Sequence, residues 1–86
     1  MIAVLVRFSL GPGTRETADN MAEGAARALR TQKGFKDVTF FGDYEAGEYG
    51  SFALWETRED AEAAIAALHL DHGPSVKVFE VVDPTD

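Results

Sequence analysis

The sequence predicts a single α+β domain in which strands and helices follow the order β-α-β-β-α-β. Two observations predict this class. Four short runs of apolar and β-branched residues are bounded by turn-forming residues, as strands are. Two other segments repeat their apolar residues at three- and four-residue steps, as amphipathic helices do. The length of 86 residues fits one domain, which we expect to span residues 1–83, with a polar tail at residues 84–86.

The first strand and the first helix have clear boundaries. Residues 2–8 are apolar with little interruption, and the sequence Gly-Pro-Gly at residues 11–13 ends the run. Residues 14–33 then place one apolar stripe along a helix, formed by Ala18, Met21, Ala22, Ala25 and Leu29. Gly34 is suited to end this helix, because glycine readily adopts the left-handed conformation.

A hairpin, a second helix and a last strand follow. Residues 38–44 and 49–56 are rich in aromatic and β-branched residues, and the segment between them contains Gly47, which predicts a β-hairpin. Thr57 is a candidate N-cap for a helix with the apolar residues Ala61, Ala64, Ile65 and Leu68. We expect this helix to end before residues 73–74, and residues 76–82 to form the last strand.

This order of elements is ferredoxin-like, with two helices on one face of a four-stranded antiparallel sheet. The other face of such a sheet is normally polar. Here both faces are apolar: the first strand carries Val4 and Val6 on one side and Ala3 and Leu5 on the other. We therefore expect a second copy to cover the free face, which gives a homodimer packed sheet to sheet.

Composition excludes several classes of function. The net charge is −7 and the few cations are scattered, which argues against a nucleic-acid partner. The absence of cysteine excludes disulfides and thiolate chemistry and suits a cytoplasmic location. The longest apolar run, residues 2–6, is too short to span a membrane, so we expect no membrane association. Phosphate-binding glycine motifs and a nucleophile elbow are also missing, which argues against nucleotide or flavin cofactors and hydrolases.

Residues 51–61 carry a resemblance to a known family. An apolar strand that ends in Trp-Glu-Thr directly before an acidic helix start, together with Gly34 and Phe35 at the second strand, resembles the antibiotic biosynthesis monooxygenase (ABM) family of dimeric α/β barrels. The resemblance covers nearly the whole chain. It implies a cofactor-independent monooxygenase that acts on a small electron-rich aromatic substrate, quinol- or anthrone-like, and works as a homodimer.

The family's functional residues are matched in part. Members that oxidise aromatic substrates have an Asn four residues before the strand-end Trp and a Tyr six residues after it. This chain keeps Trp55 but has Ser51 and Ala61 at those positions. Haem-degrading members need an Asn late in the first strand and a Trp in the second helix. Arg7 stands at the first of these positions and the second helix has no Trp, which argues against haem degradation.

Four residues are candidates for the site. Ser51 and Trp55 lie on the same side of the third strand and are candidate substrate-binding residues. We expect the first and third strands to be adjacent and parallel, which places Arg7 at the same end of the sheet as Trp55. Arg7 would then stabilise a phenolate or enolate, and His69, at the edge of the second helical stripe, would act as general base. We assign no metal-binding or cofactor-binding residue and expect no cofactor.

Structural interpretations of the same residues stay open. Trp55 also fits a packing role in the core or in a dimer interface, and Arg7 also fits an ion pair with a carboxylate. Tyr44 and Tyr49 flank the tip of the hairpin, where they form either a cross-strand pair or the mouth of a pocket.

The histidines and the overall function have alternatives as well. His69 and His72 have a spacing compatible with a metal site, but a third ligand is not placed, and a histidine at a helix end also offsets the helix dipole. Two other functions compete with the oxygenase. They are a non-catalytic ligand-binding or structural homodimer and a proton-transfer isomerase.

Overall fold

The computed structural model describes residues 1–70 and 74–82. Its elements are β1 (Ile2–Ser9), α1 (Arg15–Arg30), β2 (Phe35–Asp43), β3 (Glu48–Trp55), α2 (Arg58–Ala67) and β4 (Ser75–Glu80). This order confirms the predicted fold class. Residue 83 and the tail predicted at residues 84–86 lie outside the described residues.

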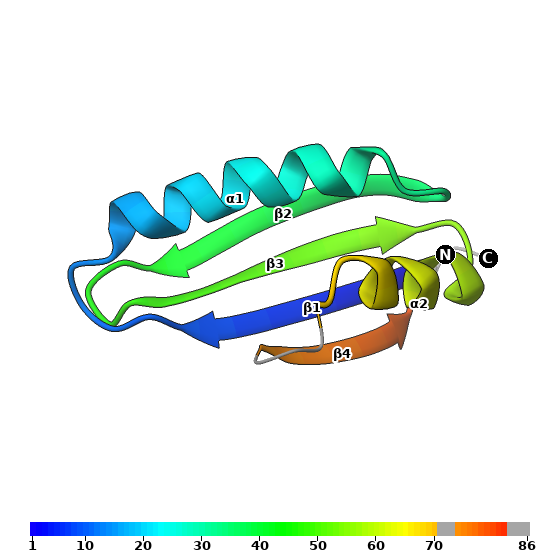
Figure 1. Cartoon of the computed structure of the whole chain (residues 1–86). Helices are drawn as coiled ribbons and strands as arrows, with labels where there is room; N and C mark the ends of the chain where they lie inside the picture. Colours follow the sequence, from blue (N-terminus) through cyan, green and yellow to red (C-terminus); the bar gives the residue numbers. More distant parts are fainter. Residues whose placement is uncertain (71–73, 83–86) are drawn as a thin grey trace.

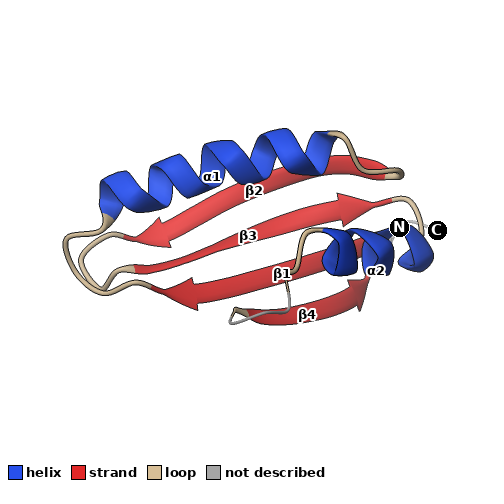
Figure 2. Ribbon diagram, viewed as in Figure 1, coloured by secondary structure: helices blue, strands red, loops and turns tan. Residues whose placement is uncertain are grey.

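The strands form one antiparallel sheet in the order β2-β3-β1-β4. Figure 1 shows α1 running along β2 and α2 lying beside β1, and Figure 2 shows the same two layers by element type. The buried cluster joins residues of both helices to residues on a single face of the strands, among them Val4 and Ala53. Both helices therefore cover the same face of the sheet.

The pairing of β1 with β3 corrects one expectation from the sequence. The two strands are antiparallel, with Ile2 opposite Trp55 and Arg7 opposite Gly50. In this topology β1 and β2 run in the same direction, and β3 lies between them in the opposite direction. Arg7 and Trp55 consequently lie at opposite ends of the sheet, and the predicted proximity of these two residues is wrong.

The core is densest where β3 ends. Trp55 is only 1% exposed, and its indole ring meets the ring of Phe35 edge-on at a centroid distance of 5.6 Å. Leu29 of α1 and Ala61 and Ala64 of α2 belong to the same buried cluster. Burial of a side chain this large supplies a substantial part of the hydrophobic stabilisation of so small a domain.

One predicted helix boundary is confirmed, and another lies earlier in the chain than predicted. The Thr57 hydroxyl oxygen accepts a hydrogen bond from the backbone N–H of Asp60 at 3.1 Å and so caps α2. Gly34 has φ +81° and leads from α1 into β2. The predicted helix is longer than the observed one, which ends at Arg30, because residues 31–34 form the turn before β2.

Strand boundaries differ from the prediction by a few residues. β2 begins at Phe35, and its pairing with β3 shifts register between Phe35 and Asp37, an irregularity that interrupts the alternation of side chains. β4 ends at Glu80, so that Val81 and Val82 lie beyond the strand.

The face of the sheet away from the helices carries exposed apolar side chains, as the sequence predicted. Phe41, Phe52 and Phe79 come from three different strands and are 44%, 41% and 45% exposed. The register places Leu5 beside Phe52, and Ala3 beside Phe79. We call the group formed by the exposed Phe41, Phe52 and Phe79 and by Leu5 of the neighbouring β1 the open-face patch.

In the part of the chain that the structure describes, neither helix has the length and apolar character needed to cross a membrane.

Gly47 holds the hairpin turn against the loop between β1 and α1. It has φ +72°, and a Cβ atom there would collide with the carbonyl group of Gly11. Its own carbonyl accepts a hydrogen bond from the N–H of Leu10 at 2.8 Å. We predict that Gly47→Ala lowers the free energy of unfolding by about 2 kcal/mol or more, because left-handed strain adds to the collision. Urea denaturation followed by circular dichroism measures the change.

Gly24→Ala is the matched control. Gly24 lies within α1 with open space at its Cβ position, so alanine should raise the free energy of unfolding by about 0.5–1 kcal/mol through its higher helix propensity. Equal stabilities of the two variants would contradict the packing role of Gly47.

Candidate functional site

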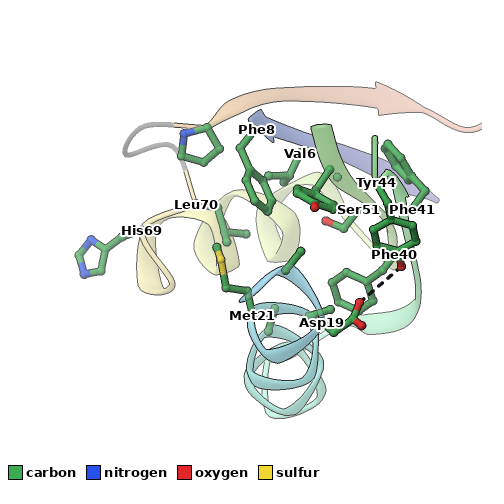
Figure 3. Close-up of a pocket in the computed structure, with 16 residues that line it drawn as sticks. Val6, Phe8, Asp19, Met21, Phe40, Phe41, Tyr44, Ser51, His69 and Leu70 are labelled. Carbon is green, nitrogen blue, oxygen red and sulfur yellow. Dashed lines mark hydrogen bonds between the residues drawn. The ribbon is translucent and has the colours of Figure 1, made fainter. Parts of the chain in front are cut away.

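A cavity of about 230 Å³ lies between α1 and the helix-covered face of the sheet, beside the end of α2 (Figure 3). Aromatic side chains from the strands, including Phe8, Phe40 and Tyr49, form much of its wall. A mostly apolar hollow with a few polar groups is the usual form of a small-molecule site. We therefore take this cavity as the candidate functional site.

The cavity exists because α1 presents small side chains toward this part of the sheet. The helix contributes Ala18, Ala22 and Ala25 to the lining, and β3 contributes Ser51. None of these side chains is long enough to fill the gap between the two layers. At the other end of α1, the cluster around Trp55 fills the same gap.

Two tyrosine hydroxyl groups that line the cavity have hydrogen-bond partners. The Tyr44 hydroxyl donates to Asp19 Oδ1 at 3.4 Å (Figure 3). The Tyr49 hydroxyl lies 3.0 Å from Thr14 Oγ1, and Thr14 donates its own hydroxyl hydrogen to the Gly11 carbonyl at 2.6 Å. Because Thr14 has one hydroxyl hydrogen, Tyr49 is the donor in its contact with Thr14.

Contacts beside the cavity join the hairpin tip to the first turns of α1. The Arg15 guanidinium lies 4.2 Å from the centroid of the Tyr44 ring, and Arg15 Nε lies 3.9 Å from Asp19 Oδ2. The rings of Tyr44 and Tyr49 are 5.9 Å apart. The two tyrosines contact each other and line the cavity, which supports the pocket interpretation. They are not a cross-strand pair, because the register places Tyr49 opposite Gly42 and Tyr44 lies beyond the end of β2.

The two predicted substrate-binding residues lie in different parts of the structure. Ser51 lines the cavity, as expected. Trp55 lies on the same face of β3 but is buried against Phe35 in the core and is not part of the cavity wall. The position of Trp55 therefore favours its interpretation as a packing residue, and its role in substrate binding stays a prediction without support from the geometry.

Arg7 lies on the face of the sheet opposite the cavity. Its side chain is exposed and borders a separate, open hollow that also includes Asp43 and Glu48. From this position the guanidinium does not line the cavity and cannot stabilise an anion within it. Arg7 and Ser51 were expected on one site, but they lie on different faces because they occupy alternating positions of paired strands.

His69 lies at the rim of the cavity, just beyond α2. Figure 3 shows its imidazole directed away from the cavity. Its backbone has φ +54°, and the next residue, Leu70, donates its N–H to the Ile65 carbonyl at 3.0 Å, an arrangement that usually has glycine at the left-handed position. The role of His69 as a base stays a prediction.

The second histidine of the metal-site alternative, His72, lies outside the described residues, as does Asp71. Within residues 1–70 and 74–82, no three histidine or carboxylate side chains gather in the way that a metal site requires.

Most of the lining residues, including Asp19 and Met21, are not among the site residues that the sequence predicts. The apolar stripe of the first helix contains a pattern that indicates the cavity. Three of its members are alanines at steps of four and three residues, Ala18, Ala22 and Ala25, and such a stripe leaves space beneath a helix unless large residues on the sheet fill it.

Comparison with solved structures identifies the architecture. SnoaB, described as a cofactor-independent oxygenase from Streptomyces nogalater, is 20% identical and superposes with a TM-score of 0.72 over 95% of this chain and 93% of SnoaB. A structure of an antibiotic biosynthesis monooxygenase is 14% identical, with a TM-score of 0.73 over 96% of this chain and all of the other. The fold is that of the antibiotic biosynthesis monooxygenases.

Another solved structure of this fold contains bound porphyrins. A variant of MhuD, solved with two manganese protoporphyrin IX molecules bound per active site, is 20% identical, with a TM-score of 0.74 over 96% of each chain. No protein-family model and no curated protein matches the sequence. Identities of this size establish the fold, and to that extent they confirm the resemblance predicted from the sequence.

We predict that Trp55→Ala lowers the free energy of unfolding by about 3–5 kcal/mol, because removal of a fully buried indole leaves a void in the core. Arg7→Ala should change it by no more than about 0.5 kcal/mol, because the side chain is exposed. Urea denaturation followed by circular dichroism compares the two variants. A Trp55→Ala protein as stable as Arg7→Ala would show that Trp55 does not have the packing role described above.

Proposed function

We propose that the protein is an ABM-family monooxygenase that oxidises a small electron-rich aromatic, quinol- or anthrone-like, without a cofactor. The observation that carries the proposal is the cavity, which is lined by aromatic and aliphatic side chains and has hydroxyl and carboxylate groups at Ser51, Tyr44 and Asp19. A flat aromatic molecule with a hydroxyl group matches this combination. The shared fold with SnoaB, described as a cofactor-independent oxygenase, supports the proposal.

The proposed reaction takes its electrons from the substrate. Loss of a proton from a hydroxyl or an activated methylene group gives an electron-rich anion, which transfers an electron to dioxygen. Recombination forms a carbon–oxygen bond. When the reacting carbon is a methylene, it becomes a carbonyl, and its two hydrogens leave with the second oxygen atom as water. When it is a ring carbon of a quinol, the product is a hydroxyquinone, and the second oxygen atom leaves as water with two of the quinol's hydrogens. The protein's contribution is to hold the substrate, exclude bulk water and accept the proton.

Two of the residues predicted from the sequence keep a place in this proposal. Ser51 lines the cavity and is proposed to bind the substrate's polar group. His69 is proposed as the base, which requires its imidazole to turn from the rim toward the cavity. Asp19, a lining carboxylate, is the competing candidate for this role. Arg7 and Trp55 are assigned no contact with the substrate.

A non-catalytic ligand-binding protein is the second candidate. The observation that favours it is the orientation of His69, whose imidazole is directed away from the cavity (Figure 3). A proton-transfer isomerase would also use the cavity and a base, but it would turn over its substrate without oxygen. Oxygen consumption therefore separates the proposed function from both alternatives.

Oxygen uptake tests the proposal. We predict that chelator-treated protein consumes oxygen above the spontaneous rate with at least one member of a panel of quinols and anthrone-like aromatics. Ala22→Leu should reduce this uptake at least about tenfold, because the added side-chain atoms occupy space that the substrate needs. Ala63→Leu is the matched control, because Ala63 is exposed on α2 and lies outside the cavity wall.

The outcomes of this experiment are separable. Uptake that Ala22→Leu abolishes and Ala63→Leu preserves supports oxygenation in the cavity. Uptake that neither variant changes would place the reaction elsewhere. If panel members bind but cause no uptake, the oxygenase proposal fails and the ligand-binding alternative replaces it.

We also propose that two copies associate through the open-face patch. The helices of one chain cover only one face of its sheet, and the patch presents exposed phenylalanine rings from β2, β3 and β4 on the other. Exposed apolar surface of this kind marks an association site. A two-fold axis through the patch would bring it against the same patch of a second copy, which is a self-complementary arrangement.

Phe52→Glu tests the homodimer. Wild-type protein should have about twice the chain mass of 9.3 kDa at micromolar concentration, and Phe52→Glu should have the mass of one chain, because the charge would be buried without a partner. Ala66→Glu adds the same charge to an exposed position of α2 and should leave the mass unchanged. Sedimentation equilibrium provides the masses, and a monomeric wild-type protein would refute the proposal.

A further inference from the structure

The polar groups of the cavity have most of their donor hydrogens already committed. The Tyr44 hydroxyl hydrogen is directed to Asp19, and the Tyr49 hydroxyl hydrogen is directed to Thr14. Thr14 cannot reverse its contact, because its own hydrogen is held by the Gly11 carbonyl at 2.6 Å. What the two tyrosine hydroxyl groups still offer a ligand is therefore their oxygen lone pairs.

The remaining polar groups of the cavity wall also offer a ligand more hydrogen-bond acceptors than donors. Asp19 is acceptor-only when ionised, and one of its oxygens already receives the Tyr44 hydroxyl. Ser51 contributes one hydroxyl, which can donate a hydrogen or accept one. Among the described lining residues there is no lysine or arginine, and His69 is directed away from the cavity (Figure 3).

The charged groups near the cavity also disfavour an anionic ligand. Asp19 supplies the only carboxylate in the described wall of the cavity. Arg15, the cation beside it, lies over the ring of Tyr44 and is not part of the wall. Arg7 lies on the opposite face of the sheet. An anionic ligand would meet a like charge at Asp19, which Arg15, outside the described wall, offsets only in part.

We infer that the cavity selects an uncharged hydroxyaromatic that donates a hydrogen bond to Asp19, and that it discriminates against aromatic carboxylates and against ligands with acceptors only. This inference rests on the proposed function for the reaction, but it concerns binding and is tested without turnover.

Three bicyclic aromatic ligands of similar size test separately the need for a hydrogen-bond donor and the effect of a negative charge on the ligand. They are 2-naphthol, 2-methoxynaphthalene and 2-naphthoate, measured by isothermal titration calorimetry without oxygen. We expect 2-naphthol to bind at least about fivefold more tightly than 2-methoxynaphthalene, which cannot donate, and at least about tenfold more tightly than the anion.

Asp19→Asn tests the assigned acceptor. The amide replaces one carboxylate oxygen with a donor and removes the charge, so the preference for 2-naphthol over 2-naphthoate should fall to about twofold or less. Glu23→Gln removes the same charge from an exposed position of α1 outside the cavity wall and should leave both preferences intact. Arg15→Gln should keep or increase the preference for 2-naphthol, because it removes the cation that partly offsets Asp19.

Each result has a distinct meaning. Equal or tighter binding of 2-naphthoate or 2-methoxynaphthalene by the wild-type protein would overturn the inference and leave the oxygenase proposal to the uptake experiment. The inference would also fail if no ligand bound, or if Glu23→Gln changed the preference as much as Asp19→Asn. A preference for 2-naphthol that depends on Asp19, in a protein without oxygen uptake, would support the inference and overturn only the proposed reaction.

Discussion

Packing of Trp55 against Phe35 is the contact around which the core between the helices and the sheet is built. The two rings meet edge-on at 5.6 Å within the cluster that includes Leu29 of α1. Large side chains fill the space between the layers at this end, whereas toward the start of α1 the helix contributes alanines. Because those alanines are too short to fill the same space, the other end of the layer contains a cavity rather than a second core.

One face of the sheet lines the cavity and the other carries the open-face patch, and β1 contributes side chains to both faces. Val6 faces the helices and lines the cavity, whereas its neighbour Arg7 faces the other side. A substitution at one position therefore acts on the ligand site, and a substitution one residue away acts on the open face. SnoaB, described as a cofactor-independent oxygenase, and MhuD, solved with manganese protoporphyrin IX, share this fold, so the fold alone does not determine the function.

Local features of the fold were predictable from the sequence, and pairwise features were not. The helix cap at Thr57 and the left-handed Gly34 depend on a few adjacent residues, and the apolar open face follows from simple alternation. The separation of Arg7 from Trp55 follows from the antiparallel pairing of β1 with β3, so the expected parallel pairing conflicted with the predicted antiparallel sheet. The cavity depends on what faces the alanines of α1, and the orientation of His69 depends on a left-handed backbone that its residue type does not favour.

The distribution of aromatic residues also gives the protein two independent optical reporters. Its single tryptophan is Trp55, buried in the core away from the cavity, and its two tyrosines, Tyr44 and Tyr49, both line the cavity. Indole fluorescence should follow unfolding and respond little to an occupied cavity, whereas near-ultraviolet bands of the phenol groups should respond directly to a bound ligand. Stability and occupancy can thus be read from the same unlabelled sample at different wavelengths.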